Sequence, residues 1–197
     1  MKNLIFMPVA DKNLVRCAWA GGHPLLTRYH DEEWGCPSHD DKRHFEFLIL
    51  EAAQAGLSWL TVLKKREGYR KLFLNFNYHQ VAHFGPRDVT RLMKDPRIIR
   101  NRLKITSAID NAGRFIEVRK EFGSFDAYLW SFSKGKPVVN RVRSLREIPP
   151  NTALSDAVSK DLKKRGFRFV GTTVIYSHLQ AVGVVNDHEN RCFRKNG

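Results

Sequence analysis

The sequence predicts an all-α fold in a single globular helical domain. Apolar residues recur at the i, i+3, i+4 spacing of amphipathic helices through most of the chain. Strand-like alternation is nearly absent, and the dipeptide Asn-Gly, which favours β-hairpin turns, occurs only at the last two positions. A length of 197 residues is close to the upper size of a single hydrophobic core, so we expect one domain.

Two strong helical patterns occupy the first half of the chain. Ser38, Asp40 and Asp41 can cap a helix that ends near Gly56. Its apolar face is formed by Phe45, Leu48, Ile49, Ala52 and Ala53. A second helix is predicted over residues 58–73. Its basic side chains are expected to point outward: Lys64, Lys65, Arg66 and Arg70.

The middle of the chain predicts a short helix, a basic connection and a long helix. Pro86 suits the first turn of the short helix, over residues 87–94, and the long helix closes near Gly123. This order suggests a helix-hairpin-helix, a motif that presents backbone N–H groups to a phosphate. The hydrophobic-Gly-x-Gly turn usual in that motif is missing, so a plain helical connection is an equal alternative.

The last third begins with a basic, Pro-punctuated segment, residues 134–150, which is expected to be a long loop between lobes. Thr152 or Ser155 can cap a helix that runs to Arg165, with Gly166 after its end. Cations in a last helical turn also complement the helix dipole, so they need not bind a ligand. A final helix is predicted over residues 172–185.

The charge balance points to a polyanionic partner. The chain has 34 Lys and Arg residues against 20 Asp and Glu residues, a formal net charge of +14 at pH 7. Nucleic acids and acidic membrane surfaces are the common polyanions. No apolar run approaches the roughly 20 residues that span a bilayer, so no membrane span is expected. RNA remains possible on charge alone, but no aromatic sheet motif supports it.

Cysteine usage indicates a reducing compartment. An odd number of cysteines, three, cannot form a disulfide framework, and the apolar stretch near the N-terminus is too short for a convincing signal segment. We therefore expect a cytoplasmic protein with an N-terminal extension over residues 1–15. A monomer is the expected state.

Two cysteines and two histidines near the chain ends suggest a metal site. Cys17 and His30 lie near one end, and His188 and Cys192 form an H-x-x-x-C pair near the other. On a helix, an i, i+4 pair presents both side chains on one face, as in HExxH motifs. Four such ligands can hold Zn²⁺ tetrahedrally and leave no open position for catalysis. A metal joining the two ends would remove roughly 5 kcal/mol of freedom from the unfolded chain.

A resemblance to a known family rests on longer motifs. They are Cys17-Ala18-Trp19, Tyr29-His30-Asp31-Glu32-Glu33-Trp34-Gly35 and Glu51-Ala52-Ala53-Gln54-Ala55-Gly56-Leu57-Ser58-Trp59. Through these motifs the sequence resembles the 3-methyladenine DNA glycosylase I family. Further matching segments follow in the same order at residues 64–67, 98–100, 162–167, 169–173 and 185–188. The resemblance covers about residues 16–192 and implies a helix-hairpin-helix DNA repair glycosylase domain over residues 16–197.

The resemblance also implies roles for particular residues. Cys17, His30, His188 and Cys192 match the family's structural zinc ligands, which would join the termini. Glu51, Tyr29, Trp59, Trp19 and Trp34 match its base pocket. Leu57, which follows Gly56, matches the residue inserted into the duplex. Some family members have a second tyrosine three residues before the Tyr-His pair, whereas this chain has Leu26, which predicts a less aromatic pocket on one side.

These residue types suit the excision of 3-methyladenine. Methylation at N3 gives the base a positive charge, which weakens its glycosidic bond. Aromatic faces attract a cation, and a carboxylate such as Glu51 adds charge and a hydrogen-bond acceptor. The nucleotide must leave the stack to reach such a pocket, and Leu57 would fill the gap. No lysine is well placed for a Schiff base, and Asp126 fits a helix start, so we expect monofunctional hydrolysis by water.

The expected partner is double-stranded DNA that contains an alkylated adenine. We assign phosphate contacts to two basic groups, Arg100, Arg102 and Lys104, and Lys163, Lys164 and Arg165. Two other functions compete with the glycosylase. A non-catalytic module of the same fold could recognise lesions without cleaving, and it would tolerate loss of Glu51 or Trp59. A zinc hydrolase would require an open position on the metal.

Overall fold

The helices predicted most strongly are present in the computed structural model, which describes residues 14–196. They are α2 (Asp41–Gln54), α3 (Trp59–Leu72), α6 (Arg102–Phe122) and α8 (Ala153–Lys164), capped respectively by the side chains of Asp40, Ser58, Asn101 and Thr152. Each capping oxygen accepts from a backbone N–H of the first turn that has no helical partner. Most of the expected N-terminal extension, residues 1–15, lies outside the described residues.

Shorter helices complete the fold between these four. They are α1 (Pro24–Glu32), α4 (Tyr78–Val81), α5 (Pro86–Lys94), α7 (Phe125–Ser131) and α9 (Thr172–Ala181). Short 3₁₀ turns lie at residues 18–20, 74–76, 145–147 and 193–196. A proline occupies the first position of both α1 and α5, where its missing N–H costs nothing. No helix between residues 14 and 196 combines the length and apolarity needed to cross a bilayer.

The end of α9 departs from the sequence-based expectation. A helix was predicted over residues 172–185, but α9 ends at Ala181 and the chain then enters a short strand, β2 (Val185–Asn186). β2 pairs in parallel with β1 (Val138–Val139), which lies in the segment expected to be loop. Gly183 makes the turn with φ of +73°, and a Cβ there would lie 2.2 Å from the backbone of Cys36. An apolar run of this length fits a buried strand as well as a helix, which explains the error.

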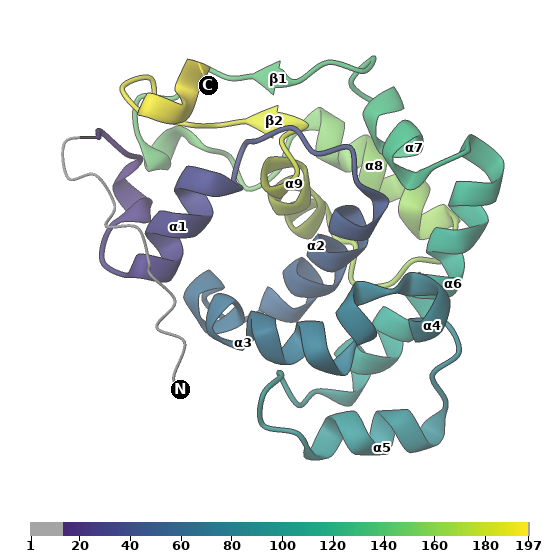
Figure 1. Cartoon of the computed structure of the whole chain (residues 1–197). Coiled ribbons are helices and arrows are strands. Elements are labelled where there is room, and N and C mark those ends of the chain that lie inside the picture. The colour runs from purple at the N-terminus through teal and green to yellow at the C-terminus, as the bar shows by residue number, and fades with distance from the viewer. Residues whose placement is uncertain (1–13, 197) are drawn as a thin grey trace.

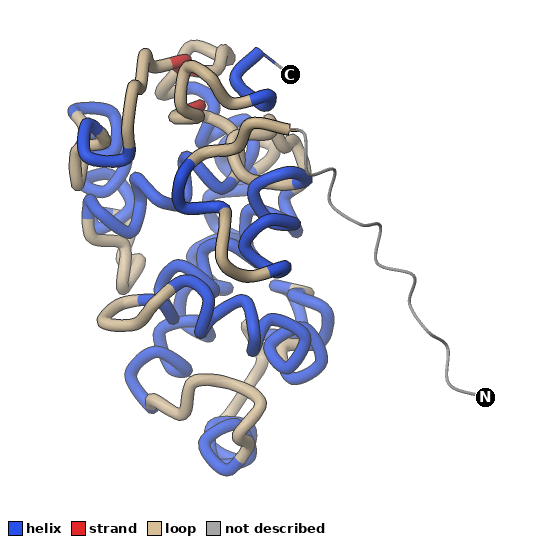
Figure 2. Tube along the Cα trace, turned by 90° about the vertical axis from the view of Figure 1, so that its left-hand side faces the viewer, coloured by secondary structure: helices blue, strands red, loops and turns tan. Residues whose placement is uncertain are grey.

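Helix α2 runs through the centre of the molecule and packs against α3, α6, α7 and α9 (Figure 1). Its buried face meets a set of aromatic rings. The ring of Phe115 contacts that of Phe45 edge-on, with centroids 5.3 Å apart, and stacks on that of Phe125, with centroids 4.2 Å apart. In both Figure 1 and Figure 2 the strands lie at one end of an elongated body and α5 lies at the other. Because α2 is central, other elements surround the residues near its C-terminal end.

The two ends of the described chain meet beside the strands. The N–H of Phe193 donates to the carbonyl of Val15 over 2.9 Å, and the N–H of Ala18 donates to the Glu189 carboxylate over 3.1 Å. These contacts join segments that are far apart in the sequence, and the Cys and His side chains singled out above lie between them.

Candidate functional site

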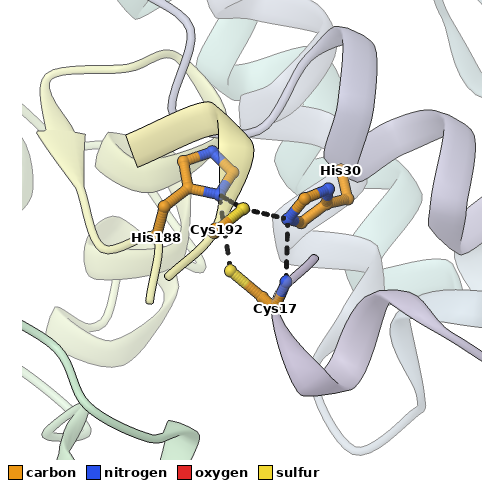
Figure 3. Close-up of side chains that lie close together, drawn as sticks. All are labelled: Cys17, His30, His188 and Cys192. Atoms are coloured by element: carbon orange, nitrogen blue, oxygen red, sulfur yellow. Dashed lines mark hydrogen bonds between the residues drawn. The ribbon is translucent and has the colours of Figure 1, made fainter. Parts of the chain in front are cut away.

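The two predicted cysteines and two predicted histidines form one buried cluster (Figure 3). The Sγ atom of Cys192 lies 3.3 Å from Nε2 of His30 and 3.4 Å from Nδ1 of His188, and Sγ of Cys17 lies 3.4 Å from the same Nδ1. Zinc bonds of about 2.3 Å to sulfur and about 2.0–2.1 Å to nitrogen give ligand separations of about 3.5 Å in a tetrahedron. The donor set and its spacing therefore fit Zn²⁺.

The elements that hold this cluster differ from the expectation. His188 and Cys192 were predicted to share one face of a helix, but they lie in the irregular segment after β2. Cys17 directly precedes a 3₁₀ turn, and His30 belongs to α1. The spacing argument thus gave the right residues through the wrong local geometry, because a loop brings the H-x-x-x-C pair together here.

Neighbouring groups orient both imidazole rings. Nδ1 of His30 lies 2.8 Å from the Asp31 carboxylate, which Arg16 contacts in turn, and Nε2 of His188 donates to the carbonyl of Trp34 over 2.9 Å. Each ring therefore directs its other nitrogen into the cluster, as second partners of metal-bound histidines do. Burial lowers the pKa of His188 to about 4, which keeps the ring neutral and able to ligate.

A cluster of aromatic rings lies beside the histidines. The ring centroids of Tyr29 and Trp59 are 5.1 Å apart, those of Trp19 and Trp34 are 4.9 Å apart, and those of Trp19 and Tyr29 are 6.2 Å apart. The structure thus brings all four predicted pocket aromatics together. Nε1 of Trp59 is buried and has no hydrogen-bond partner among the described residues.

Glu51 is buried near the C-terminal end of α2 without a partner. Glu51 is only 4% exposed, and none of the described residues forms a hydrogen bond or ion pair with its carboxyl group. Burial raises the pKa of this carboxyl to about 8. A buried carboxyl that is left unbonded is costly unless a ligand supplies the missing contacts, so Glu51 is the strongest indicator of a binding site in the structure.

A cavity of about 200 Å³ opens next to Glu51, between the end of α2 and the start of α9. Its lining is formed by Glu51, Gln54, Ala55, Gly56, Leu57, Thr173, Val174 and Ser177. Leu57 lies at the turn between α2 and α3 and is 41% exposed, so its side chain is accessible from outside the protein. The predicted wedge residue and the predicted recognition residue therefore share one cavity.

The predicted phosphate-binding cations fall into two kinds. Arg100, Arg102, Lys163 and Lys164 are exposed. Lys104 instead donates to the carbonyls of Ala53 and Ala55, over 2.9 and 2.6 Å. Arg165 forms ion pairs with Glu121 and Asp161 and stacks on aromatic rings. The last two cations are thus already engaged within the protein.

Sequence reasoning missed a buried ion network behind the aromatic cluster. Arg66 was expected to point outward, but its side chain is only 13% exposed and contacts Glu33 at 2.7 Å and Glu46 at 2.8 Å. Arg66 and Arg43 also lie over the ring of Phe47, which stacks against Trp59. The spacing carries a signal, because Arg66 follows Val62 by four residues and precedes Tyr69 by three, which places it on the buried face of α3.

Sequence reasoning assigned no role to Thr173, Val174 and Ser177, the three α9 residues that line the cavity. Thr173 belongs to the matching segment at residues 169–173, and Gly171 begins the helix without a side-chain cap, but neither signal indicated a cavity. Asp126 does not line this cavity. It lies in the first turn of α7, and its carboxylate contacts His39 and His44.

Comparison with known proteins assigns the family. The family model described as methyladenine glycosylase matches residues 19–195. The chain is 50% identical over 177 residues to DNA-3-methyladenine glycosylase 1 of Escherichia coli (strain K12), covering 90% of this chain and 95% of that protein. It is 44% identical to DNA-3-methyladenine glycosylase of Haemophilus influenzae, covering 90% and 96%. The chain belongs to the methyladenine glycosylase family.

Solved structures agree with this assignment. A crystal structure of 3-methyladenine DNA glycosylase I is 48% identical, with a TM-score of 0.89, and the match covers 91% of this chain and 99% of the other. A Staphylococcus aureus 3-methyladenine DNA glycosylase I, solved to explain 3-methyladenine recognition, is 36% identical, with a TM-score of 0.89 and coverage of 92% and 97%. The predicted mostly helical domain is therefore confirmed as the fold of this family.

Proposed function

We propose that this protein excises 3-methyladenine from alkylated double-stranded DNA by hydrolysing its N-glycosidic bond. The observation that supports this most directly is the buried, unbonded carboxyl of Glu51 beside a cavity and an aromatic cluster. Relatives that match nearly the whole chain are named for this activity. A cationic base supplies what the site lacks, because it offers a positive charge and hydrogen-bond donors to a carboxylate.

The reaction needs little catalytic assistance, because the positive charge of the methylated base already weakens the glycosidic bond. Water attacks C1′ of the flipped nucleotide, the C1′–N9 bond breaks, and its electron pair passes to the base, which leaves as a neutral molecule. The proton of the attacking water goes to solvent. Tyr29 and Trp59 attract the cationic base through their aromatic faces, and Glu51 stabilises its charge as the nucleotide enters the pocket. Recognition of the cationic base therefore accounts for most of the catalysis in this proposal.

The Cys17, His30, His188 and Cys192 cluster would hold a structural Zn²⁺. When bound, the metal cross-links the two ends of the chain. Burial raises the pKa of the Cys17 thiol to about 12, and a bound divalent cation would reverse this by stabilising the thiolate. Because the protein supplies all four ligands, nothing in this arrangement favours a zinc hydrolase.

The DNA backbone would lie across the exposed cations and the start of α9. The helix-hairpin-helix was expected at α5 and α6, but α8 and α9 also form a hairpin, through residues 165–171. The first turn of α9 has no side-chain cap and lines the cavity that contains Glu51. We therefore assign the phosphate-binding hairpin to α8 and α9, with Arg100, Arg102, Lys163 and Lys164 as further phosphate contacts.

The direct test is release of free base from methylated DNA. Wild-type protein should release 3-methyladenine, identified by chromatography, and Glu51→Gln should be slower by about tenfold or more, as expected for loss of a charged contact. Glu117→Gln, an exposed substitution on α6, is the matched control and should match wild type. A folded, metal-loaded wild type that releases no base would disprove the proposed activity.

A further inference from the structure

The ammonium group of Lys104 closes the C-terminal end of α2. Lys104 belongs to the first turn of α6, and its Nζ atom donates to the carbonyl of Ala53 over 2.9 Å and to the carbonyl of Ala55 over 2.6 Å. The last carbonyls of a helix have no partner within it and form the negative end of its dipole. The ammonium group of a lysine on another helix supplies both the missing hydrogen-bond donors and a positive charge at the negative end of the dipole.

This contact is built into the protein and does not belong to a loosely held surface side chain. Lys104 is half-buried and lines a small cavity together with Ile49, Ala53 and Tyr69. Partial burial lowers the pKa of the ammonium group. Two of its three donor hydrogens are used inside the protein, which leaves little capacity for a phosphate.

The segment that Lys104 holds is the one that carries the wedge residue. Ala53 and Ala55 directly precede Gly56 and Leu57, and the N–H of Leu57 donates to the carbonyl of Gln54 over 2.6 Å. Gly56 has φ of +79°, a conformation that gives this turn little intrinsic stiffness. Contacts from outside the turn must therefore fix the direction in which Leu57 projects.

We propose that Lys104 is a positioning residue that fixes the 53–57 turn so that Leu57 enters the duplex, and that it does not contact phosphate. This inference rests on the proposed function, in which Leu57 fills the gap left by the flipped nucleotide. It replaces the expectation from sequence, where Lys104 was grouped with Arg100 and Arg102 as a phosphate contact. It also links the first turn of α6 to the base site through one side chain.

The test separates positioning from phosphate binding by salt dependence. Lys104→Met keeps the apolar stem and removes both donors. Single-turnover release of 3-methyladenine from methylated duplex should fall about tenfold, since hydrogen bonds from a charged group are lost. Affinity for the duplex should keep the salt slope of wild type, and binding of free 3-methyladenine, measured by tryptophan fluorescence, should not change. Lys120→Met, an exposed substitution on the same helix, is the charge-matched control.

A double-mutant comparison completes the test. Leu57→Ala combined with Lys104→Met should be no slower than Leu57→Ala alone, because both changes disable the same wedge. The proposal would be overturned if Lys104→Met lowered the slope of log affinity against log salt by about one and if its effect on the rate simply added to that of Leu57→Ala. That result would identify Lys104 as a phosphate contact. Wild-type rates in Lys104→Met would also overturn it. If Lys104→Met does not fold, Lys104→Gln replaces it in every comparison. An inactive wild type would instead reject the proposed function.

Discussion

Tyr29 and Glu51 are buried neighbours on α1 and α2, and the charge of one affects the ionisation of the other. Burial raises the pKa of Tyr29 well above its ordinary value, and a negative charge on Glu51 raises it further. Burial alone raises the pKa of Glu51 to about 8. Both groups are therefore mostly uncharged at neutral pH in the free protein, and a cationic base is the ligand that would favour ionisation of Glu51.

This relationship predicts that Glu51 destabilises the folded protein at alkaline pH. Folding raises the pKa of Glu51 from its ordinary value of 4.5 to about 8. The folded state thus holds the proton more tightly, and the contribution of Glu51 to stability falls as pH rises from about 4.5 to 8. Glu51→Gln should match wild type near pH 5 and exceed it by a few kcal/mol near pH 9. Urea unfolding at several pH values measures this, and parallel stability curves would contradict it.

Metal removal should loosen both ends of the chain. Cys192→Ser removes one thiolate from the four-ligand cluster and should lower bound zinc, measured by elemental analysis, and the melting temperature. The expected loss of stability is on the order of 5 kcal/mol, the estimate for a cross-link across most of the chain. Cys36→Ser is the matched control, because Cys36 lies outside the cluster, and it should retain the metal. Equal zinc content in both variants would show that the cluster does not bind it.

Helix positions followed from local signals in the sequence, whereas the short strands did not. Caps such as Asp40 and Ser58 act on their own backbone, so they can be recognised without knowing the fold. β1 and β2 exist only because segments distant in the sequence meet, and an apolar run of a few residues does not reveal that. Local chemistry was therefore predictable, and long-range pairing was not.

The candidate site divides in the same way. The four-residue Cys/His cluster was already suggested by residue type and spacing, whereas the four aromatic residues were found only through motif resemblance, which already contains the tertiary arrangement. Charge alone did not reveal the internal contacts of Arg66 and Lys104, because the sequence does not show whether a cation meets solvent, a carboxylate or a carbonyl. Burial decides between these outcomes, and burial depends on elements that pack from elsewhere in the chain.

The Arg66 network gives a prediction about stability. Arg66→Met removes the most buried cation of this network, whereas Arg43 still contacts Glu33 and Arg70 still contacts Glu46. The expected loss is therefore about 1.5–3 kcal/mol, the range for hydrogen bonds to charged groups. Arg114→Met breaks an exposed pair with Glu117 on α6 and should cost less than about 1 kcal/mol. Urea denaturation compares the two. A loss for Arg66→Met no larger than that for Arg114→Met would mean that the network adds little.

Exposed cations and cations that are already paired within the protein should contribute differently to the salt dependence of DNA binding. Arg100→Ala or Lys163→Ala removes an exposed charge and should lower the slope of log affinity against log salt by about one phosphate each. Arg165→Ala should leave the slope unchanged and lower the melting temperature, because its guanidinium already pairs with Glu121 and Asp161. Binding to an abasic duplex across a salt series measures the slopes. A reduced slope in Arg165→Ala with unchanged stability would place that side chain on the DNA after all.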